Sequence, residues 1–460
     1  MHSLYGRLST LIIFSCASLF ASAQDTVLPV AYLPSDTTTL FARLDRITER
    51  SIATFPPAER NIVQEIFLER ADDLKDAVLD GSYLFQPALQ QFVEDIFTEL
   101  VTANALALEP LVFISRSPSA NAASLGDGLF VVNIGLLTRM SSRDELASVF
   151  GHELAHDQLL HLRDKLGFLV QQRSREPADR KEERALRRRL RREGRHKVMS
   201  EMRDLVYEQS RHGRSNELAA DSLGMTYLLR SGFQASAAAT SLTKLRDDDP
   251  FVLPDSALQL ALHTKSYPFK EKWIAAPRVM FGGSFGGAEE DGEKRMFWQK
   301  DSLATHPNLA ERITGARLRI GVDSAAGPDS SDHDWIEPSR RLIVTRYLER
   351  GLSAHAICMS VAALAATPDD PFYVEAIGRA LLNTYRSIED HDFGRRIPPT
   401  GYFDDAGARQ LLLLLHQIRN SELQRLTLAY LAERAAAFPR ESTLARLHEE
   451  ATHYFNTLDE

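Results

Sequence analysis

Ser141-Ser-Arg-Asp-Glu-Leu-Ala-Ser-Val-Phe-Gly-His-Glu-Leu-Ala-His156 has the residue pattern of one helix. Ser142 is a favourable N-cap residue, and Glu145, three residues later, completes a capping box. The apolar residues that predict its buried face recur at helical spacing and are Leu146, Val149 and Phe150. The segment therefore predicts an amphipathic helix that begins after Ser142.

Two histidines of this helix have the spacing of zinc ligands. His152 and His156 are four residues apart and project from one face of the helix. Two imidazoles at this spacing bind one zinc ion with bonds of about 2.0–2.1 Å. Glu153 places a carboxylate beside the ion, where it takes a proton from a bound water whose pKa zinc lowers to about 7. The pattern predicts a zinc hydrolase, with a chance match on a polar helix as the alternative.

A second helix supplies two acidic residues to the predicted site. Within Gly213-Arg-Ser-Asn-Glu-Leu-Ala-Ala-Asp-Ser-Leu-Gly224, Glu217 and Asp221 are four residues apart and share one face. Glu217 is the candidate third zinc ligand, and Asp221 is the candidate acceptor for the outer nitrogen of a ligand histidine. A pair of surface acids is the alternative, but Ala219 and Ala220 beside them favour close helix packing.

A small sheet is predicted ahead of the zinc helix. Leu111–Ile114 and Gly128–Ile134 are β-rich, and Pro118, Asn121 and Gly126 mark the connection between them. A substrate that adds a strand to such a sheet binds mainly through its backbone. A purely structural hairpin is the alternative, and the sequence does not separate the two. Helices are expected before the sheet, over residues 59–74 and 87–107.

The N-terminus has the pattern of a secretory signal peptide over residues 1–23. Leu8–Phe20 is mostly apolar, and Ala21-Ser-Ala23 forms a small-residue cleavage site. A lipoprotein signal ending at Cys16 is the alternative, but the bulky Phe14 stands where a small residue is usual. No later run has the 18 or more apolar residues of a membrane helix. We therefore expect an exported, soluble mature chain.

Composition restricts the remaining classes. The 460 residues are 44% hydrophobic and 25% charged, as in ordinary globular proteins, and the net charge of −9 gives no signal for nucleic acid. Only Cys16 and Cys358 occur, so the mature chain has no intramolecular disulfide and no thiolate zinc site. Cys358 is expected to be a buried small apolar residue.

Two segments between the motifs carry weaker predictions. Residues 163–214 are strongly basic, and we interpret them as solvated helix faces in preference to a polyanion or lipid site. Residues 281–292 are rich in glycine but lack the Gly-Lys-Ser ending of a phosphate-binding loop. They are predicted to form a loop, with a lid over the site as one option.

The chain divides into five parts by pattern. Residues 24–56 form a mixed lead-in with loop signals at Asp36–Thr39, residues 57–320 a zinc metallopeptidase domain, and residues 321–338 a Ser-, Asp-, Pro- and Gly-rich linker. Residues 339–460 are predicted to be helical. The expected helices are Leu342–Glu349, Ser353–Ala366, Phe372–Tyr385, Asp404–Ile418, Glu422–Ala437 and Ser442–Phe455. They could form a helical repeat array, although no strict repeat period is present.

With these motifs in place, residues 57–320 resemble the HtpX, BepA and Oma-type zinc metallopeptidases, the family that also contains the CAAX prenyl endopeptidases. The matching motifs follow the family's order and are Asn121-Ala122, Gly135-Leu136-Leu137, Gly151-His-Glu-Leu-Ala-His156 with His161, Arg214-x-x-Glu217-x-x-Ala220-Asp221, and Thr305-His-Pro307 with Arg312-Ile313. One departure is Gly213, where the family usually has serine.

The resemblance implies a mainly α fold with a small β-sheet (α+β), in which a zincin-like domain precedes a helical, TPR-like domain. It implies one zinc ion per chain. The residues it assigns are His152, His156 and Glu217 as ligands, Glu153 as general base, Asp221 and Arg214 as residues that support the ligands, and Asn121 and His306 as groups that face the substrate or stabilise the transition state.

The resemblance also implies a role. The chain is expected to be a periplasmic zinc endopeptidase that acts on unfolded or misassembled envelope polypeptides, with a partner protein on its C-terminal helices. Association with the outer membrane stays open, with membrane contact peripheral at most, and no nucleic acid is expected. The alternatives are a chaperone-like scaffold with a gated site, and a polyanion or membrane-surface binder acting through Arg180–Lys197.

Overall fold

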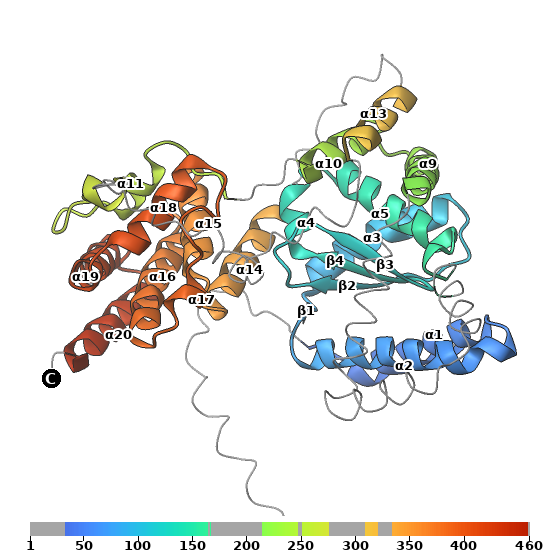
Figure 1. Cartoon of the computed structure of the whole chain (residues 1–460), viewed down its shortest axis with the longest axis horizontal. Coiled ribbons are helices and arrows are strands. Elements are labelled where there is room, and N and C mark those ends of the chain that lie inside the picture. The colour runs from blue at the N-terminus through green and yellow to red at the C-terminus, as the bar shows by residue number, and fades with distance from the viewer. Residues whose placement is uncertain are drawn as a thin grey trace, which may run out of the picture.

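The computed structural model describes residues 33–163, 166, 214–246, 251–275, 309–320 and 334–458. These residues form many helices and one four-stranded sheet, so the predicted mainly α fold with a small sheet is confirmed. Figure 1 shows two groups of elements side by side. We call the group that contains the sheet the peptidase lobe, after the family that its motifs resemble, and the group that contains the last helices of the chain the C-terminal lobe.

The sheet has the strand order β1-β2-β4-β3. Its strands are β1 (Tyr83–Leu84), β2 (Leu111–Ser115), β3 (Ala122–Gly126) and β4 (Leu129–Asn133). Strand β4 runs parallel to β2, whereas β1 and β3 are antiparallel to their neighbours. The predictions of β2 and β4 are confirmed. The interpretation of β3 as a connection is wrong, because Ala122–Gly126 pairs along the free edge of β4. Its sequence contains no β-branched residue and so does not indicate a strand.

Alternate residues of the strands enter two different cores. Leu111, Phe113 and Leu129 pack against α1 (Thr37–Ala53) and α2 (Pro57–Leu79). Val112 and Phe130 point to the opposite face, toward α3 (Pro87–Ala103) and α5 (Arg143–Gln158). Because successive side chains of a strand alternate between faces, the apolar residues at consecutive strand positions are buried on both sides of the sheet. The peptidase lobe is accordingly layered helix, sheet, helix (Figure 1).

The predicted loop at Asp36–Thr39 is wrong. Asp36 is the N-cap of α1, and its Oδ1 accepts a hydrogen bond from the backbone N–H of Thr39 at 3.0 Å. Short polar side chains favour turns and helix N-caps alike. Here the apolar residues that follow at helical spacing favour a helix. Leu44 and Ile47 supply that face and are buried under the sheet.

Helix α5 starts where the sequence predicts it to start. The hydroxyl of Ser142 accepts the N–H of Glu145 at 3.2 Å, as in a capping box. In a capping box the Glu145 carboxylate would accept the backbone N–H of Ser142. Here it accepts the N–H of Ser141 at 2.8 Å and pairs with Lys244 at 2.6 Å. The other helices that the described residues form in this lobe are α4 (Ile134–Arg139), α9 (Arg214–Arg230), α10 (Ala237–Arg246) and α13 (Leu309–Ile320).

All six helices predicted after residue 339 are present. They are α14 (Ile336–Glu349), α15 (Ser353–Ala366), α16 (Pro371–Glu389), α18 (Ala406–Gln417), α19 (Asn420–Ala437) and α20 (Ser442–Leu458), with a short additional helix α17 (Phe393–Arg396). Helix α14 starts within residues 321–338, the segment predicted to be a linker. Cys358 of α15 is fully buried, as predicted.

Residues 251–275 lie on the C-terminal lobe, although they precede α13 in sequence. We call them the crossing segment; it contains α11 (Ala257–Leu262) and the 3₁₀ helix η1 (Glu271–Trp273). Phe251 lies 4.7 Å from Phe403 between ring centroids, and Trp273 is buried against the same lobe. Glu433 of α19 accepts the backbone N–H groups of residues 265 and 266. The described chain thus leaves the peptidase lobe after α10 and returns at α13.

Among the helices in the described ranges, none has the length and apolar character needed to cross a membrane. Several sequence predictions lie outside the described residues. They are the signal peptide, the basic segment apart from its two ends, the glycine-rich loop 281–292 and His306.

Candidate metal centre

Helices α5 and α9 meet at two glycines, and this contact brings the predicted ligands together. A Cβ on Gly224 would lie 3.0 Å from the Cα and N atoms of His152, and one on Gly151 would lie 3.3 Å from the carbonyl oxygen of Gly224. Any side chain at Gly224 would therefore push the two backbones apart. The close crossing places Glu217 and Asp221, on the first two turns of α9, against the histidines of α5.

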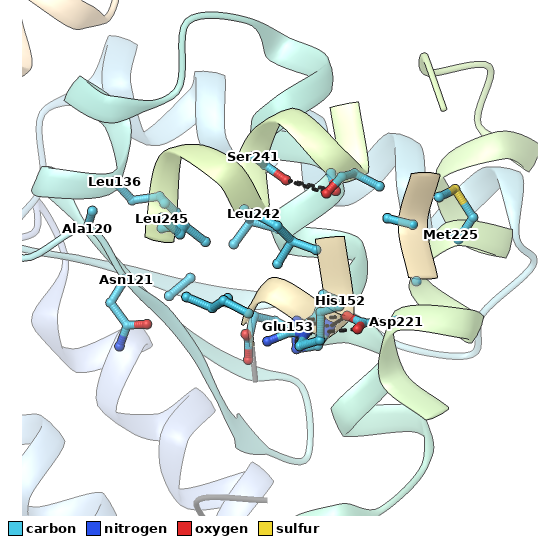
Figure 2. A pocket seen from close by; sticks show the side chains of 18 of the residues that line it. Ala120, Asn121, Leu136, His152, Glu153, Asp221, Met225, Ser241, Leu242 and Leu245 are labelled. Atoms are coloured by element: carbon cyan, nitrogen blue, oxygen red, sulfur yellow. Dashed lines mark hydrogen bonds and ion pairs between the residues drawn. The ribbon is translucent and has the colours of Figure 1, made fainter. Parts of the chain in front are cut away.

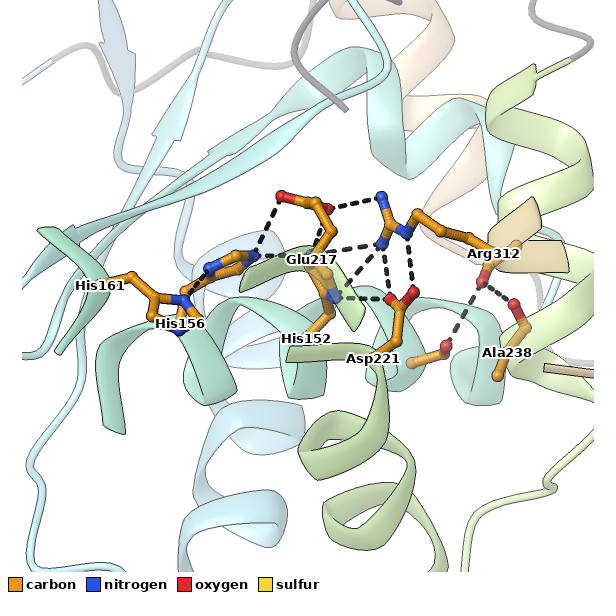
Figure 3. Close-up of polar contacts among 9 residues, drawn as sticks. His152, His156, His161, Glu217, Asp221, Ala238 and Arg312 are labelled. Atoms are coloured by element: carbon orange, nitrogen blue, oxygen red, sulfur yellow. Dashed lines mark hydrogen bonds and ion pairs between the residues drawn. The ribbon is translucent and has the colours of Figure 1, made fainter. Parts of the chain in front are cut away.

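His152, His156 and Glu217 form a buried cluster of potential metal ligands. The Nε2 atoms of the two histidines are 2.9 Å apart. Oε2 of Glu217 lies 3.5 Å from Nε2 of His152, and Oε1 lies 3.6 Å from Nε2 of His156. Figure 3 shows the three side chains converging from α5 and α9. The predicted ligand set is therefore assembled in one place.

The outer nitrogens of both histidines are held by other side chains (Figure 3). Nδ1 of His152 is 3.0 Å from Oδ1 of Asp221, the partner predicted from the sequence. Nδ1 of His156 is 2.8 Å from Nδ1 of the buried His161. A hydrogen bond at the outer nitrogen fixes the tautomer and the orientation of a ligand imidazole. Both Nε2 atoms are consequently directed at the same point.

The surrounding charges favour a cation at this point. Burial and the positive charge of Arg312 lower the pKa of His152, but hydrogen bonds to Asp221 and Glu217 outweigh them and raise it to about 9. Burial raises the pKa of Asp221, yet its hydrogen bonds to His152 and Arg312 bring it down to about 2. Asp221 is therefore ionised at neutral pH and stabilises positive charge on the imidazole beside it.

The donor set fits zinc. A tetrahedral ion with bonds of about 2.0–2.1 Å holds its ligand atoms about 3.3 Å apart. One ligand atom from each of the three residues lies within 4.8 Å of the others, and each Glu217 oxygen is 3.5–3.6 Å from the nearer histidine nitrogen. Two imidazoles and one carboxylate are also the protein ligands of many catalytic zinc sites, which keep a fourth position for water. His152, His156 and Glu217 would hold the ion.

Glu153 is placed to act beside the ligands. Its side chain is buried, and its Oε2 accepts the backbone N–H of Ser124 at 2.8 Å. Ser124 belongs to β3, which is the edge strand of the sheet. The carboxylate thus lies between the edge strand and the ligand cluster, where it can orient a water and take its proton.

Arg312 is the site residue that sequence reasoning missed. Its Nη1 is 2.8 Å from Oε2 of Glu217, and its Nε and Nη2 are 2.9 and 2.7 Å from the two oxygens of Asp221. The sequence contains Arg312 in a matching motif, but a cation 91 residues after Asp221 has no spacing that indicates this contact. The family motif that contains Arg312 and Ile313 is the signal that could have indicated a role for this arginine.

A cavity opens beside the ligands, and Figure 2 shows its lining. Asn121, His152 and Glu153 line its polar side. The remaining lining is mostly apolar apart from Asp221, Arg312 and Arg319, and it comes from the start of β3 and from α4, α5, α9, α10 and α13. Its apolar part includes Leu136, Val149, Met225, Leu242, Leu245 and Leu309. Asn121 precedes β3 directly and is half-buried, so the structure brings this predicted residue to the same cavity as Glu153.

Two predicted site residues stay without a structural description. Arg214 is the first residue of α9, but its side chain is outside the described part of the structure, and His306 lies outside the described residues altogether. Their roles remain predictions.

The helix with His-Glu-x-x-His, the acidic residue from a following helix and the adjacent edge strand define a metallopeptidase. Comparison with known proteins identifies the family. The profile of peptidase family M48 matches residues 87–320, half of the chain, and the chain belongs to this family. The match contains His152, Glu153, His156 and Glu217.

A relative agrees with this assignment. The chain is 29% identical over 302 residues to a protein of Vibrio cholerae serotype O1 whose name designates a beta-barrel assembly-enhancing protease. The alignment covers 63% of this chain and 58% of that protein. The chain therefore spans less than two thirds of the relative's length.

Proposed function

We propose that the chain is an exported zinc endopeptidase that cleaves unfolded or misassembled envelope proteins in the periplasm. The observation that carries the proposal is the buried cluster of His152, His156 and Glu217 with Glu153 beside it. Membership of a metallopeptidase family supports the reaction. The N-terminal signal-peptide pattern and the name of the Vibrio cholerae relative support the location and the substrate class.

Zinc bound at this cluster would polarise a water and the scissile carbonyl. Glu153 takes the proton of that water and passes it to the leaving amine. The N–H of Ser124 holds the carboxylate in place. Asn121 and His306 are proposed to face the substrate, and Arg214 and Asp221 to support the ligands.

The edge strand β3 supports binding of an extended peptide. A polypeptide that pairs with β3 as a fifth strand would pass Glu153, because Ser124 of β3 contacts this residue. Pairing through the backbone requires an unfolded segment of the substrate and depends little on its sequence. This mode of binding therefore suits unfolded proteins. The apolar cavity next to His152 and Glu153 would accept an apolar side chain next to the scissile bond. The C-terminal lobe is proposed to bind an envelope protein partner.

The test compares zinc-loaded residues 24–460 with their Glu153→Gln variant on unfolded casein. We expect both proteins to hold zinc, and the variant to cleave at least about 100-fold more slowly, since a general base contributes about 10²–10⁴-fold. Glu109→Gln, at an exposed position away from the site, is the matched control. Cleavage at the parent's rate by Glu153→Gln would exclude the proposed base. Zinc without cleavage in all three proteins would favour the chaperone-like alternative.

A further inference from the structure

Arg312 joins the ligand cluster from a part of the chain distant in sequence. Its side chain projects from α13 into the layer between α5 and α9, and only 4% of the residue is exposed (Figure 3). Nη1 is 2.8 Å from Oε2 of Glu217, the same oxygen that lies 3.5 Å from Nε2 of His152. The other Glu217 oxygen, Oε1, lies toward His156, at 3.6 Å from its Nε2.

We propose that Arg312 is a positioning residue that makes Glu217 bind the metal through one oxygen. This inference rests on the proposed zinc site. The guanidinium engages Oε2 and would keep this oxygen away from the ion, so Glu217 would bind through Oε1, which faces His156. The second position that a bidentate carboxylate would take would then stay open for water. A catalytic zinc site needs such an open position, because the attacking water occupies it.

The same guanidinium fixes a second supporting group. Nε and Nη2 hold the two oxygens of Asp221 at 2.9 and 2.7 Å, and Oδ1 of Asp221 contacts Nδ1 of His152 at 3.0 Å. Arg312 therefore contacts Glu217 directly. It contacts His152 both through Asp221 and directly, because Nη2 lies 3.3 Å from each ring nitrogen of His152. Only a planar group with several N–H donors can do both, which distinguishes arginine from lysine at this position.

The experiment uses the full mature chain loaded with Co²⁺, whose visible absorption reports the number of ligands. The variants are Arg312→Lys, which keeps the charge but loses the forked donors, and Arg312→Met, which removes the charge. Arg317→Met, at an exposed position of the same helix, is the control. Metal dissociation constants are measured in parallel by competition with a chelator, and circular dichroism establishes that each variant is folded.

We expect the strong absorption of four-coordinate cobalt in the parent and in Arg317→Met. In Arg312→Lys the absorption should weaken toward the five-coordinate type as Glu217 becomes bidentate, and the dissociation constant should rise about 10- to 100-fold, as for other residues that orient ligands. Arg312→Met should show a larger change in both the absorption and the dissociation constant. If Arg312→Met does not fold, the result for Arg312→Lys tests the proposal by itself.

Two other outcomes would overturn the inference in distinguishable ways. A folded Arg312→Lys variant with the spectrum and affinity of the parent would show that Arg312 does not control the ligand, while the zinc site would stand. A parent chain that binds no cobalt would overturn the proposed function itself, and the inference with it.

Discussion

His152 and His156 occupy equivalent positions one helical turn apart, but different groups orient them. A carboxylate, Asp221, holds His152, whereas a second imidazole, His161, holds His156. A carboxylate makes a ligand histidine more basic, while an imidazole at hydrogen-bond distance fixes the direction of the ligand ring. The two supporting residues therefore act on metal binding by different means.

Replacing His161 by phenylalanine should raise the zinc dissociation constant about 10- to 100-fold, the usual effect of losing a partner of a ligand. The reason is that Nδ1 of His156 loses its 2.8 Å contact while the ring volume at position 161 is kept. Chelator competition measures the change, with His263→Phe, at an exposed site, as control. Unchanged affinity in His161→Phe would mean that His161 has no orienting role.

For single residues, the sequence predicted the pairs of site residues that lie one turn apart on the same helix. The pairs His152–His156 and Glu217–Asp221 follow from the helical period, and the structure places them together. The contact of Arg312 with these groups could not be predicted, because it depends on how α13 returns to the peptidase lobe. No local pattern contains that information.

Among the helices, the close contact between the backbones of α5 and α9 sets the distance between the metal ligands. Gly224→Ala should separate α9 from α5, because the added Cβ would meet backbone atoms of His152 at 3.0 Å. We expect weaker zinc binding and a loss of about 1–3 kcal/mol in the free energy of unfolding, as for other overpacked sites. Chelator competition and urea unfolding measure both effects.

The matched control is Gly315→Ala in α13, where an added Cβ meets no atom within 4 Å. Alanine is the better helix former, so this variant should be neutral or slightly more stable. Equal zinc affinity in Gly224→Ala and Gly315→Ala would show that the close crossing does not position Glu217.

A buried histidine of α15 should make the C-terminal lobe acid-sensitive. The rings of Phe251, Tyr347, Tyr402 and Phe403 surround His355 at centroid distances of 5.0–5.6 Å. Burial, and secondarily the charge of Arg350, lowers its pKa to about 3 from an ordinary value of 6.5. Below pH 6.5 the unfolded chain binds a proton that the folded chain excludes, so stability falls as the pH is lowered from 6.5 toward 3.

The expected slope is about 1.4 kcal/mol per pH unit from this residue. Urea unfolding at a series of pH values, for the parent and for His355→Gln, measures it. The variant should be less stable at pH 8 because it loses packing, but its stability should fall less steeply below pH 6.5. Parallel curves for the two proteins would exclude His355 as the source of acid sensitivity.

The errors at this scale have physical causes. Polar residues at 36–39 suit both a loop and an N-cap, so the start of α1 was interpreted as a loop. Strand β3 is short and has no β-branched residues, and it forms because its backbone pairs with the edge of β4. By contrast, the long apolar repeats after residue 339 predicted every helix of four or more turns there.

In the whole molecule, the path of the chain between the two lobes determines which residues fold together. The crossing segment buries Phe251, Leu253, Leu258, Leu262 and Trp273 in a core that includes the C-terminal helices and continues into α3 and α5 of the peptidase lobe. Two glutamates of α19 anchor it: Glu422 pairs with Lys270 and Lys272, and Glu433 holds residues 265 and 266. We therefore propose that residues 57–320 do not form a self-contained unit, contrary to the sequence-based division.

A fragment of residues 24–320 should expose this apolar segment. We expect it to bind a hydrophobic dye and to associate in solution, whereas residues 24–460 should do neither, because large exposed apolar patches promote association. Light scattering and dye fluorescence on the two proteins measure the difference. A monomeric fragment that binds no dye would support the domain boundary predicted from the sequence.

We propose that His152, His156 and Glu217 together bind one zinc ion. The zinc content of purified residues 24–460, determined by mass spectrometry alongside the Glu217→Ala variant, tests this proposal. We expect one zinc per chain in the parent and a large loss in the variant. No zinc in the parent, or unchanged zinc in Glu217→Ala, would contradict it.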